Sequence, residues 1–518
     1  MDTSKQSQTP RTRQFRLQRF FVALLVLWGF AIVLQTSSLL EVSRNRLTTS
    51  LGLQRAIDFG LTWRRHNRSA VDSPPEPLVD AGDSSEVSDE DSLHLSLLHE
   101  HCVANSNATL TWQFGSPGHQ LADGTASNPE VVMHRDEPDL LQKLRQCPDV
   151  DIFLPSDLHG NGYCEDAVAY AKYLNSRLLP EWALSIKLFD PELGREVDYF
   201  DLCPKTPMIF FNHYWKGAPV MPRWPKDKPI YLMPNIEMFE LTPVHYWKVD
   251  AVLCKTKECY DRVKKWYEQE GNPRNASVFF TKHTSSDQAL FARKRLGEDA
   301  IAPKNFSEVK FIHTAGTSTG KGTRELLQCW VLVPGLPPLD VYMDNKPFER
   351  LFKPNFKRLI KFSRSPLTMH LGLIERSAFT KLTAEAAYFM CPSTSEGYGH
   401  YINQARASGA FVVTTDVSPM NELIANETGV LIPVKRRKHT KMILGGAYRG
   451  KHGLKDVDGL VASFKGPDIC EAVFEMVRST TTEQRAAMGA NARRAYHQDT
   501  KYFARAMQEL REFARRGN

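Results

Sequence analysis

Short hydrophobic runs alternate with helical patterns along the chain beyond Pro148. This alternation is typical of βαβ units and of mainly parallel sheets. In the first half, strands are expected over residues 151–154, 184–188, 208–211, 230–233, 251–254 and 278–280, and helices over 165–178 and 257–268. In the second half, strands are expected over residues 310–313, 339–343, 388–391 and 411–415, and helices over 324–330, 378–385 and 401–408. The pattern predicts an α/β chain of two facing halves with a cleft between them.

The chain is expected to be helical beyond Asp468. Apolar residues recur there on one stripe at helical spacing, namely Tyr496, Phe503, Met507, Leu510 and Ala514. Such a stripe is typical of a helix face that packs on a core. We therefore expect these last helices to pack back on the body.

The N-terminal region has a different pattern. No charged residue occurs between Phe20 and Leu40, which suits a helix crossing a hydrocarbon layer of ~30 Å. Basic residues crowd its N-terminal side, so the tail is expected in the cytoplasm and the rest across the membrane; a cleavable signal peptide is the alternative. Residues 71–91 hold eight carboxylates and no Lys or Arg, as in a solvated stem. Ordered structure is expected to begin between Cys102 and Cys147.

Charge, glycosylation motifs and cysteines indicate the compartment and the partners of the main part of the chain. The net charge of +7 does not indicate a nucleic-acid partner, because five basic residues against one acid precede the hydrophobic span. Five Asn-x-Ser/Thr motifs begin at Asn67, Asn107, Asn275, Asn305 and Asn426. The nine cysteines show no CxxC spacing, which favours a few disulfides over a zinc ribbon and leaves at least one cysteine over. These features predict a glycosylated body in an oxidising compartment.

Residues 310–327 (KFIHTAGTSTGKGTRELL) run from an apolar strand through a glycine-rich turn into a helix. Free backbone N–H groups at the start of that helix, together with Lys321, would form a cradle for phosphate. The segment is therefore a candidate phosphate site.

This turn has three other interpretations. A P-loop would need a glycine at Ala315 and a hydroxyl at Gly322, and the chain has neither. The run from Gly316 to Gly320 matches the G-x-S-x-G elbow of serine hydrolases, with Ser318 as the nucleophile, but no local signal fixes its Asp and His partners. A polar turn that only caps the helix is the third.

Residues 390–423 end a strand, present Glu-Gly-Tyr-Gly at 396–399 and begin a helix near His400. A carboxylate and closely approachable glycine amides at a strand end can hold sugar hydroxyls and a phosphate together. The segment resembles the donor-site motif of the retaining GT-B glycosyltransferases, in which P-S-x-x-E-G-x-G opens a pattern of Glu, seven residues and Glu. The resemblance is strong over residues 309–434 and weak over 151–287.

The resemblance implies roles for single residues. Glu396, with the amides of Gly397 and Gly399, would hold the donor hexose. The second position of the pattern is Gln404, an amide that would face the ribose through a weaker bond than the usual Glu. Other residues that the resemblance places at the donor are Gly316, Thr317, Ser318, Lys321, Gly322, Tyr398 and His400. Lys321 would stabilise the diphosphate, and the usual Gly-Arg pair of the family reads Gly316-Thr317 here.

The first half offers a weaker counterpart on the acceptor side. The expected acceptor-side loop contains Gly160, Asn161 and Gly162, although turn formation alone would also explain its glycines. His213 ends the strand of residues 208–211 and is a candidate for the cleft beside the donor sugar; a structural role is the alternative. Asn235 and Glu237 follow the next strand in a similar way.

No bound metal is expected. Asp149 and Asp151 stand at the start of a buried strand, which favours a structural role for both. The resemblance implies that a helix dipole and basic side chains replace a metal at the diphosphate.

The resemblance implies an α/β GT-B fold of two Rossmann-like domains behind a transmembrane helix and stem. The expected regions are a cytoplasmic tail (1–19), a signal anchor (20–40), a partly disordered lumenal stem (41–145), an acceptor domain (146–300), a donor domain (301–470) and terminal helices (471–518). The hypothesis is an enzyme that moves a hexose from a UDP- or GDP-sugar to a hydroxyl of a glycan, protein or lipid, with retention. A degenerate glycan-binding or scaffold protein and a hydrolase using Ser318 are the alternatives. The expected location is the Golgi or endoplasmic reticulum, as a single-pass type II protein.

Overall fold

The computed structural model of the protein describes residues 87–114, 132–160 and 162–517. The sequence-predicted tail and membrane span, residues 1–40, lie outside these ranges, as do Asn67 and Asn161. Among the helices of the described ranges, none combines the length and apolar character that crossing a membrane requires.

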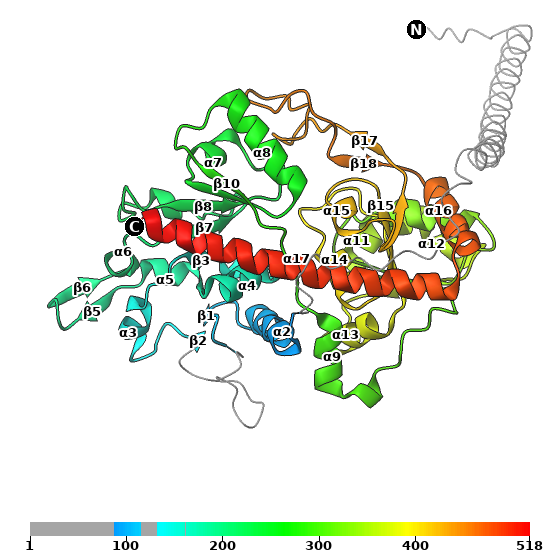
Figure 1. Ribbon diagram of the computed structural model, residues 1–518, viewed down its shortest axis with the longest axis horizontal. Coiled ribbons are helices and arrows are strands. Elements are labelled where there is room, and N and C mark those ends of the chain that lie inside the picture. Colours follow the sequence, from blue (N-terminus) through cyan, green and yellow to red (C-terminus); the bar gives the residue numbers. More distant parts are fainter. Residues whose placement is uncertain (1–86, 115–131, 161, 518) are drawn as a thin grey trace, which may run out of the picture. The chain divides into compact units, whose positions relative to one another are not determined.

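An eight-stranded sheet forms the core of the N-terminal lobe, with strand order β10-β9-β8-β7-β3-β4-β1-β2 (Figure 1). Its strands are β1 Thr109–Thr111, β2 Val132–Met133, β3 Asp151–Phe153, β4 Arg177–Leu179, β7 Met208–Phe211, β8 Ile230–Met233, β9 Ala251–Cys254 and β10 Ser277–Phe280. The strands from β10 to β4 pair in parallel, whereas β1 and β2 pair antiparallel at one edge. Because parallel strands are covered on both faces, β7, β8 and β9 are unbroken apolar runs and are buried throughout.

A six-stranded, fully parallel sheet forms the core of the C-terminal lobe, with strand order β13-β12-β11-β14-β15-β16. Its strands are β11 Phe311–Gly316, β12 Leu339–Met343, β13 Leu367–Leu371, β14 Tyr388–Cys391, β15 Phe411–Thr415 and β16 Gly429–Ile432. The strand order reverses between β11 and β14, and in the N-terminal lobe between β3 and β7. Ligands of open α/β sheets bind at the carboxyl ends of strands beside such a reversal.

Helices cover both sheets, and two short antiparallel pairs of strands stand apart from them. The helices of the N-terminal lobe are α2 Asp89–Ala104, α3 Leu140–Arg145, α4 Tyr163–Leu174, α5 Glu181–Ser185, α6 Tyr199–Leu202, α7 Pro243–Trp247 and α8 Lys257–Glu270. Those that follow are α9 Gln288–Leu296, α10 Thr323–Leu332, α11 Asn345–Pro347, α12 Lys353–Lys361, α13 Arg376–Glu385, α14 His400–Ala407, α15 Met420–Leu423, α16 Gly466–Ser479 and α17 Thr482–Gly517. The two strand pairs are β5 Leu188–Asp190 with β6 Arg195–Val197, and β17 Lys435–Arg437 with β18 Val461–Ser463.

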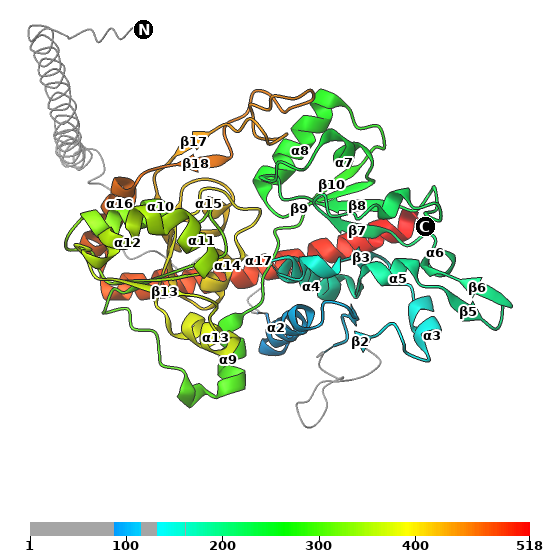
Figure 2. The ribbon, with the colours of Figure 1, turned by 180° about the vertical axis from the view of Figure 1, so that it is seen from behind.

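The 36-residue helix α17 runs along both lobes, as Figure 2 shows from behind. It contacts β15 and β16 of the C-terminal lobe and α4 of the N-terminal lobe. The stripe predicted from Tyr496 to Ala514 is buried, and Phe503, Met507 and Leu510 belong to the core of the N-terminal lobe. The terminal helix therefore fastens the C-terminal lobe to the N-terminal one.

Three expectations about local structure were wrong. The helix expected over 165–178 ends at Leu174, because Asn175 adopts a left-handed conformation and the chain turns into β4. Where a strand was expected over 184–188, residues 184–185 end the short helix α5 and Leu188 begins β5. Ordered structure begins earlier than expected, because α2 starts at Asp89.

Four disulfides are present, which agrees with the prediction of a few disulfides. The sequence did not predict which cysteines pair. The disulfides join Cys102 to Cys164, Cys147 to Cys203, Cys254 to Cys259, and Cys329 to Cys470. The remaining cysteine, Cys391, is buried in β14.

Candidate active site

Two loops meet where the strand order of the C-terminal lobe reverses. The loop after β11 carries Lys321, and the loop after β14 carries Glu396. Thr394 ties the loops together, because its backbone N–H and its hydroxyl both donate to the carbonyl of Gly320, at 2.8 and 2.9 Å. As a result Lys321 Nζ lies 3.0 Å from Glu396 Oε1.

The Lys321–Glu396 pair is partly buried and held on both sides. The side chains are 14% and 17% exposed, which leaves each able to meet a ligand. Ser393 donates to Glu396 Oε1 at 2.5 Å and lies 2.6 Å from the hydroxyl of Tyr401. The ammonium of Lys321 stands 3.3 Å from the centre of the Tyr401 ring, a cation–π contact. A cation and a carboxylate are thus fixed side by side at the strand ends.

Glycines shape the turn before α10. Gly322 has φ +65°, and a Cβ there would lie 2.0 Å from the carbonyl oxygen of Pro392, so only glycine fits. Gly316 also has a positive φ, +55°, but open space around it. The free N–H groups at the start of α10 follow directly after Lys321. This arrangement is suited to a diphosphate.

His313 and Thr323 support this turn from inside. His313 Nδ1 lies 2.8 Å from the carbonyl of Met390, and its Nε2 lies 2.9 Å from the hydroxyl of Thr323. Burial lowers the pKa of His313 to about 4, so the ring is neutral at pH 7. His313 therefore joins β11, β14 and α10 without adding charge.

His400, expected at the donor, connects the two lobes. Its Nε2 lies 3.0 Å from Asp166 Oδ1 at the start of α4, and its Nδ1 lies 2.8 Å from the hydroxyl of Ser285. A Cβ on Gly162 would lie 3.4 Å from the His400 ring, so the expected acceptor-side loop touches the donor-side helix α14. Gly160 in the same loop is exposed.

Asp166, Lys255 and His283 were not predicted from the sequence. Both oxygens of Asp166 accept from Lys255 Nζ, at 2.8 and 3.0 Å, and His283 Nε2 lies 3.0 Å from Asp166 Oδ1. Burial alone would raise the pKa of Asp166, but Lys255 and His400 hold it well below its usual value. Asp166, His283 and His400 lie close enough to ligate a metal ion. Lys255 already supplies a cation to both oxygens of that carboxylate, so we assign these residues to an internal network of charged and polar contacts.

Gln404, expected to face the ribose, donates to Glu165 Oε1 at 2.7 Å. Glu165 is buried and also accepts from the backbone N–H and the hydroxyl of Ser286, at 2.9 and 2.6 Å. His99 Nδ1 of helix α2 lies 3.4 Å from the same carboxylate. The amide at position 404 is therefore engaged with the opposite lobe.

The loop after β8 reaches the donor loop. A Cβ on Gly397 would lie 2.4 Å from the side chain of Asn235, so the two lobes are in close contact here. The backbone N–H of Asn235 donates to the side-chain carbonyl of Asn212 at the end of β7. Burial raises the pKa of Glu237 to about 7, and the negative charge of Glu396 acts in the same direction. Glu237 is thus an ionisable group at this junction.

Two expected site residues, His213 and Tyr398, have contacts with residues other than the Lys321–Glu396 pair. His213 is partly buried against Tyr214, and its Nδ1 has no hydrogen-bond partner among the described residues. The side chain of Tyr398 is buried, and its hydroxyl donates to the carbonyl of His283.

The turn residues Thr317 and Ser318 remain at the surface of the donor loop. Thr317 is exposed, and Ser318 accepts from the N–H of Gly320 at 3.3 Å. Within the described residues no histidine or carboxylate hydrogen-bonds Ser318, so the hydrolase alternative lacks a base.

The two aspartates at β3 have structural partners. Asp149 accepts from Arg511 and Arg515 of α17, and Asp151 accepts from Arg177 and from the hydroxyl of Tyr199. Of the glycosylation motifs in the described ranges, all four asparagines, Asn107, Asn275, Asn305 and Asn426, are exposed.

Two Rossmann-like domains with a cation and a carboxylate at the strand-order reversal define the GT-B architecture of nucleotide-sugar glycosyltransferases. Residues 353–442 match the family model described as glycosyl transferases group 1. The matched segment runs from α12 past β16 and includes Glu396. The enzyme class expected from the sequence is confirmed: the chain is a glycosyltransferase.

Solved structures of similar architecture include three bacterial proteins. A sucrose-phosphate synthase from Thermosynechococcus elongatus is 11% identical with a TM-score of 0.45, covering 71% of this chain and 98% of that one. HepE from Anabaena, solved with UDP and glucose, is 12% identical with a TM-score of 0.41, covering 70% and 90%. A UDP-forming α,α-trehalose-phosphate synthase from Burkholderia vietnamiensis is 11% identical with a TM-score of 0.42, covering 60% and 75%. No curated protein matches the sequence.

Proposed function

We propose that the protein transfers a hexose from a UDP- or GDP-sugar to a hydroxyl of a glycan, protein or lipid acceptor, with retention at the anomeric carbon. The observation that carries the proposal is the 3.0 Å contact between Lys321 Nζ and Glu396 Oε1 at the strand ends of the C-terminal lobe. The ammonium of Lys321 suits the diphosphate of such a donor, and the carboxylate of Glu396 suits the hydroxyls of its sugar.

Lys321 and Glu396 would contact different parts of a bound donor. Lys321 and the start of α10 would stabilise the charge that develops on the leaving diphosphate. Glu396, kept in place by Ser393, would accept from hydroxyls of the hexose. The contact of Gly397 with Asn235 supports a closed cleft, which would exclude water and limit hydrolysis.

The proposal extends to the location of the protein. A single-pass type II protein of the Golgi or endoplasmic reticulum, with its body in the lumen, would combine the uncharged span of residues 20–40 with the features of the body. Four disulfides and four exposed glycosylation motifs support such an oxidising, glycosylating compartment.

The test removes each member of the pair separately. Lys321→Met and Glu396→Gln should each lower the release of nucleoside diphosphate from UDP- and GDP-sugars by about a hundredfold or more, as expected for a lost electrostatic contact. Lys310→Met and Asp340→Asn serve as matched controls, because that pair, 2.8 Å apart, lies at the opposite end of the same sheet. Unfolding midpoints measured in parallel confirm that all variants are folded.

Full activity of either site variant contradicts the assignment of the pair. A second candidate function, a degenerate glycan-binding protein, is favoured by the engagement of Gln404 with Glu165. That candidate predicts that the unaltered protein releases no nucleoside diphosphate from any donor of the panel.

A further inference from the structure

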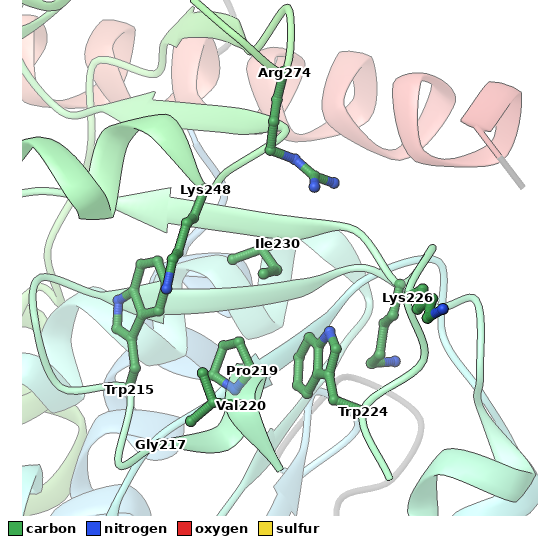
Figure 3. A pocket seen from close by; sticks show the side chains of 10 residues that line it. Trp215, Gly217, Pro219, Val220, Trp224, Lys226, Ile230, Lys248 and Arg274 are labelled. Carbon is green, nitrogen blue, oxygen red and sulfur yellow. The ribbon is translucent and has the colours of Figure 1, made fainter. Parts of the chain in front are cut away.

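A pocket opens in the N-terminal lobe at the end of the sheet opposite the candidate active site (Figure 3). Its volume is about 340 Å³. Ile230 begins β8, and Lys248 and Arg274 precede β9 and β10, so the pocket lies at the amino ends of these strands. The other wall is the connection from β7 to β8, residues 212–229. None of the proposed donor-binding residues lines it.

Two indole rings form the walls of the pocket. Figure 3 shows Trp215 and Trp224 on either side of Pro219 and Val220. Trp215 is fixed, because its Nε1 donates to the carbonyl of Asn212 at 2.7 Å. Trp224 packs on the ring of Phe200, and its Nε1 has no hydrogen-bond partner within the described residues. Trp215 is largely buried against Phe210 and His245, so the partly exposed Trp224 presents the main flat apolar face and the free donor to a ligand.

Two of the four described basic residues that line the pocket are uncompensated. Lys226 and Lys248 are exposed, and in the described part of the chain neither ammonium has a hydrogen bond or an ion pair. Arg274 is paired with Asp250, at 2.6 and 3.0 Å. Lys228 turns inward, so its charge is used within the lobe. Since none of the described lining residues is acidic, the pocket attracts anions.

Flat apolar faces and free ammonium groups together fit an acidic sugar. The C–H face of a pyranose ring stacks on an indole, and a carboxylate or sulfate on that ring would pair with the lysines. A membrane surface fits less well, because lipid headgroups are met by projecting basic and apolar side chains, whereas these indoles line a recess.

The wall of the pocket also leads to the candidate active site. Residues 212–229 start at Asn212, which holds Trp215 at one side and the backbone of Asn235 at the other. Asn235 in turn touches Gly397 of the donor loop. A four-residue strand spans about 13 Å, so several sugar units would be needed to reach from one end of the sheet to the other.

The geometry points to a second glycan-binding site: the Trp215–Trp224 pocket binds an acidic residue of the acceptor glycan, several sugar units from the hydroxyl that receives the hexose. The identification of this glycan as the acceptor rests on the proposed function. The binding itself does not, because the pocket needs no donor.

Binding is measured first, without any donor. Tryptophan fluorescence and calorimetry would follow titration with hexasaccharides of polygalacturonate and of chondroitin sulfate, and with neutral cellohexaose. We expect both acidic chains to bind at least tenfold more tightly than the neutral chain, with affinity falling as salt rises. Lys226→Gln/Lys248→Gln should weaken that binding at least tenfold. The matched control Lys294→Gln/Lys357→Gln, which removes two exposed lysines elsewhere, should leave it unchanged.

Equal affinity for the acidic and neutral chains, or no effect of the Lys226/Lys248 substitutions, overturns the proposal. So does binding to phosphatidylserine vesicles that depends on the same two lysines and exceeds binding to the acidic chains. With active enzyme, the Lys226/Lys248 variant should raise the KM for an acidic acceptor tenfold or more and leave kcat unchanged.

The two proposals fail in different ways. Lys321→Met should bind the acidic chains as the unaltered protein does. Binding without transfer by the unaltered protein contradicts only the proposed function, and transfer without acidic-chain binding contradicts only the pocket.

Discussion

Replacing Glu237 by Gln should change how the stability of the protein depends on pH. Oε2 of Glu237 is buried and has no hydrogen-bond partner among the described residues. Burial raises the pKa of this carboxyl from 4.5 to about 7; Lys255 opposes the rise, and the charges of Glu396 and Asp166 add to it. The folded protein therefore keeps Glu237 protonated at pH values at which the unfolded chain has released the proton.

The size and sign of the effect follow from this difference. One pKa unit is worth about 1.4 kcal/mol, so ionised Glu237 costs the folded state roughly 3 kcal/mol. Below pH 4.5 the carboxyl is protonated in both states and the cost is absent. The cost grows between pH 4.5 and about 7 and is complete above pH 7. Stability present at low pH is therefore lost as the pH rises.

Urea unfolding at pH 5, 6, 7 and 8 measures this directly. Glu237→Gln cannot ionise, so its unfolding free energy relative to the unaltered protein should rise by roughly 2.5 kcal/mol from pH 5, where part of the cost is already present, to pH 8. Glu268→Gln, which removes an exposed carboxylate of α8, is the control for the loss of a charge. A difference that is constant with pH, or that grows toward pH 5, refutes the reasoning.

Two further substitutions test the geometry of the site. Gly322→Ala should prevent folding or lower stability by more than about 3 kcal/mol in urea unfolding, because its Cβ meets the carbonyl of Pro392, whereas Gly316→Ala should cost only about 1 kcal/mol for its positive φ. Gln404→Glu should lower stability by about 2 kcal/mol at pH 8, because it sets two carboxylates against each other. Adding Glu165→Gln should restore that stability, and a lack of restoration would show that the facing charge is not the cause.

The general fold could be predicted because its signals are local. A strand buried on both faces needs a continuous apolar run, and most strands of the two sheets have one. The expected strand at 184–188 failed because a short apolar run does not distinguish a strand from a buried helical turn. β1 and β2 were missed because they lie at the antiparallel edge of the sheet, outside the alternating strand and helix units from which the other strands were predicted. β4, β13 and β16 were missed as well.

The candidate site could be predicted only in part, because only some of its residues belong to local sequence motifs. Lys321 and Glu396 stand in loops that follow strands, so their sequence motifs and their place in the sheet coincide. Asp166 lies in the first turn of α4, where an acidic residue is ordinarily explained by the helix dipole. Lys255 ends up beside it only because β9 and α4 meet in the folded lobe. Contacts between residues far apart in the chain produce no motif of fixed spacing, so the sequence does not reveal them.

A contact between distant elements also explains why Gln404 stands where the donor-site pattern has its second Glu. From the sequence alone, an amide in place of a carboxylate weakens the case for a working donor site. In the folded protein the residue facing position 404 is the buried carboxylate of Glu165, which already accepts from Ser286. A second carboxylate at this position would be held against the first in a region of low dielectric, where like charges repel strongly. The amide donates a hydrogen bond where a carboxylate could only accept one, so the substitution follows from the contact between the lobes.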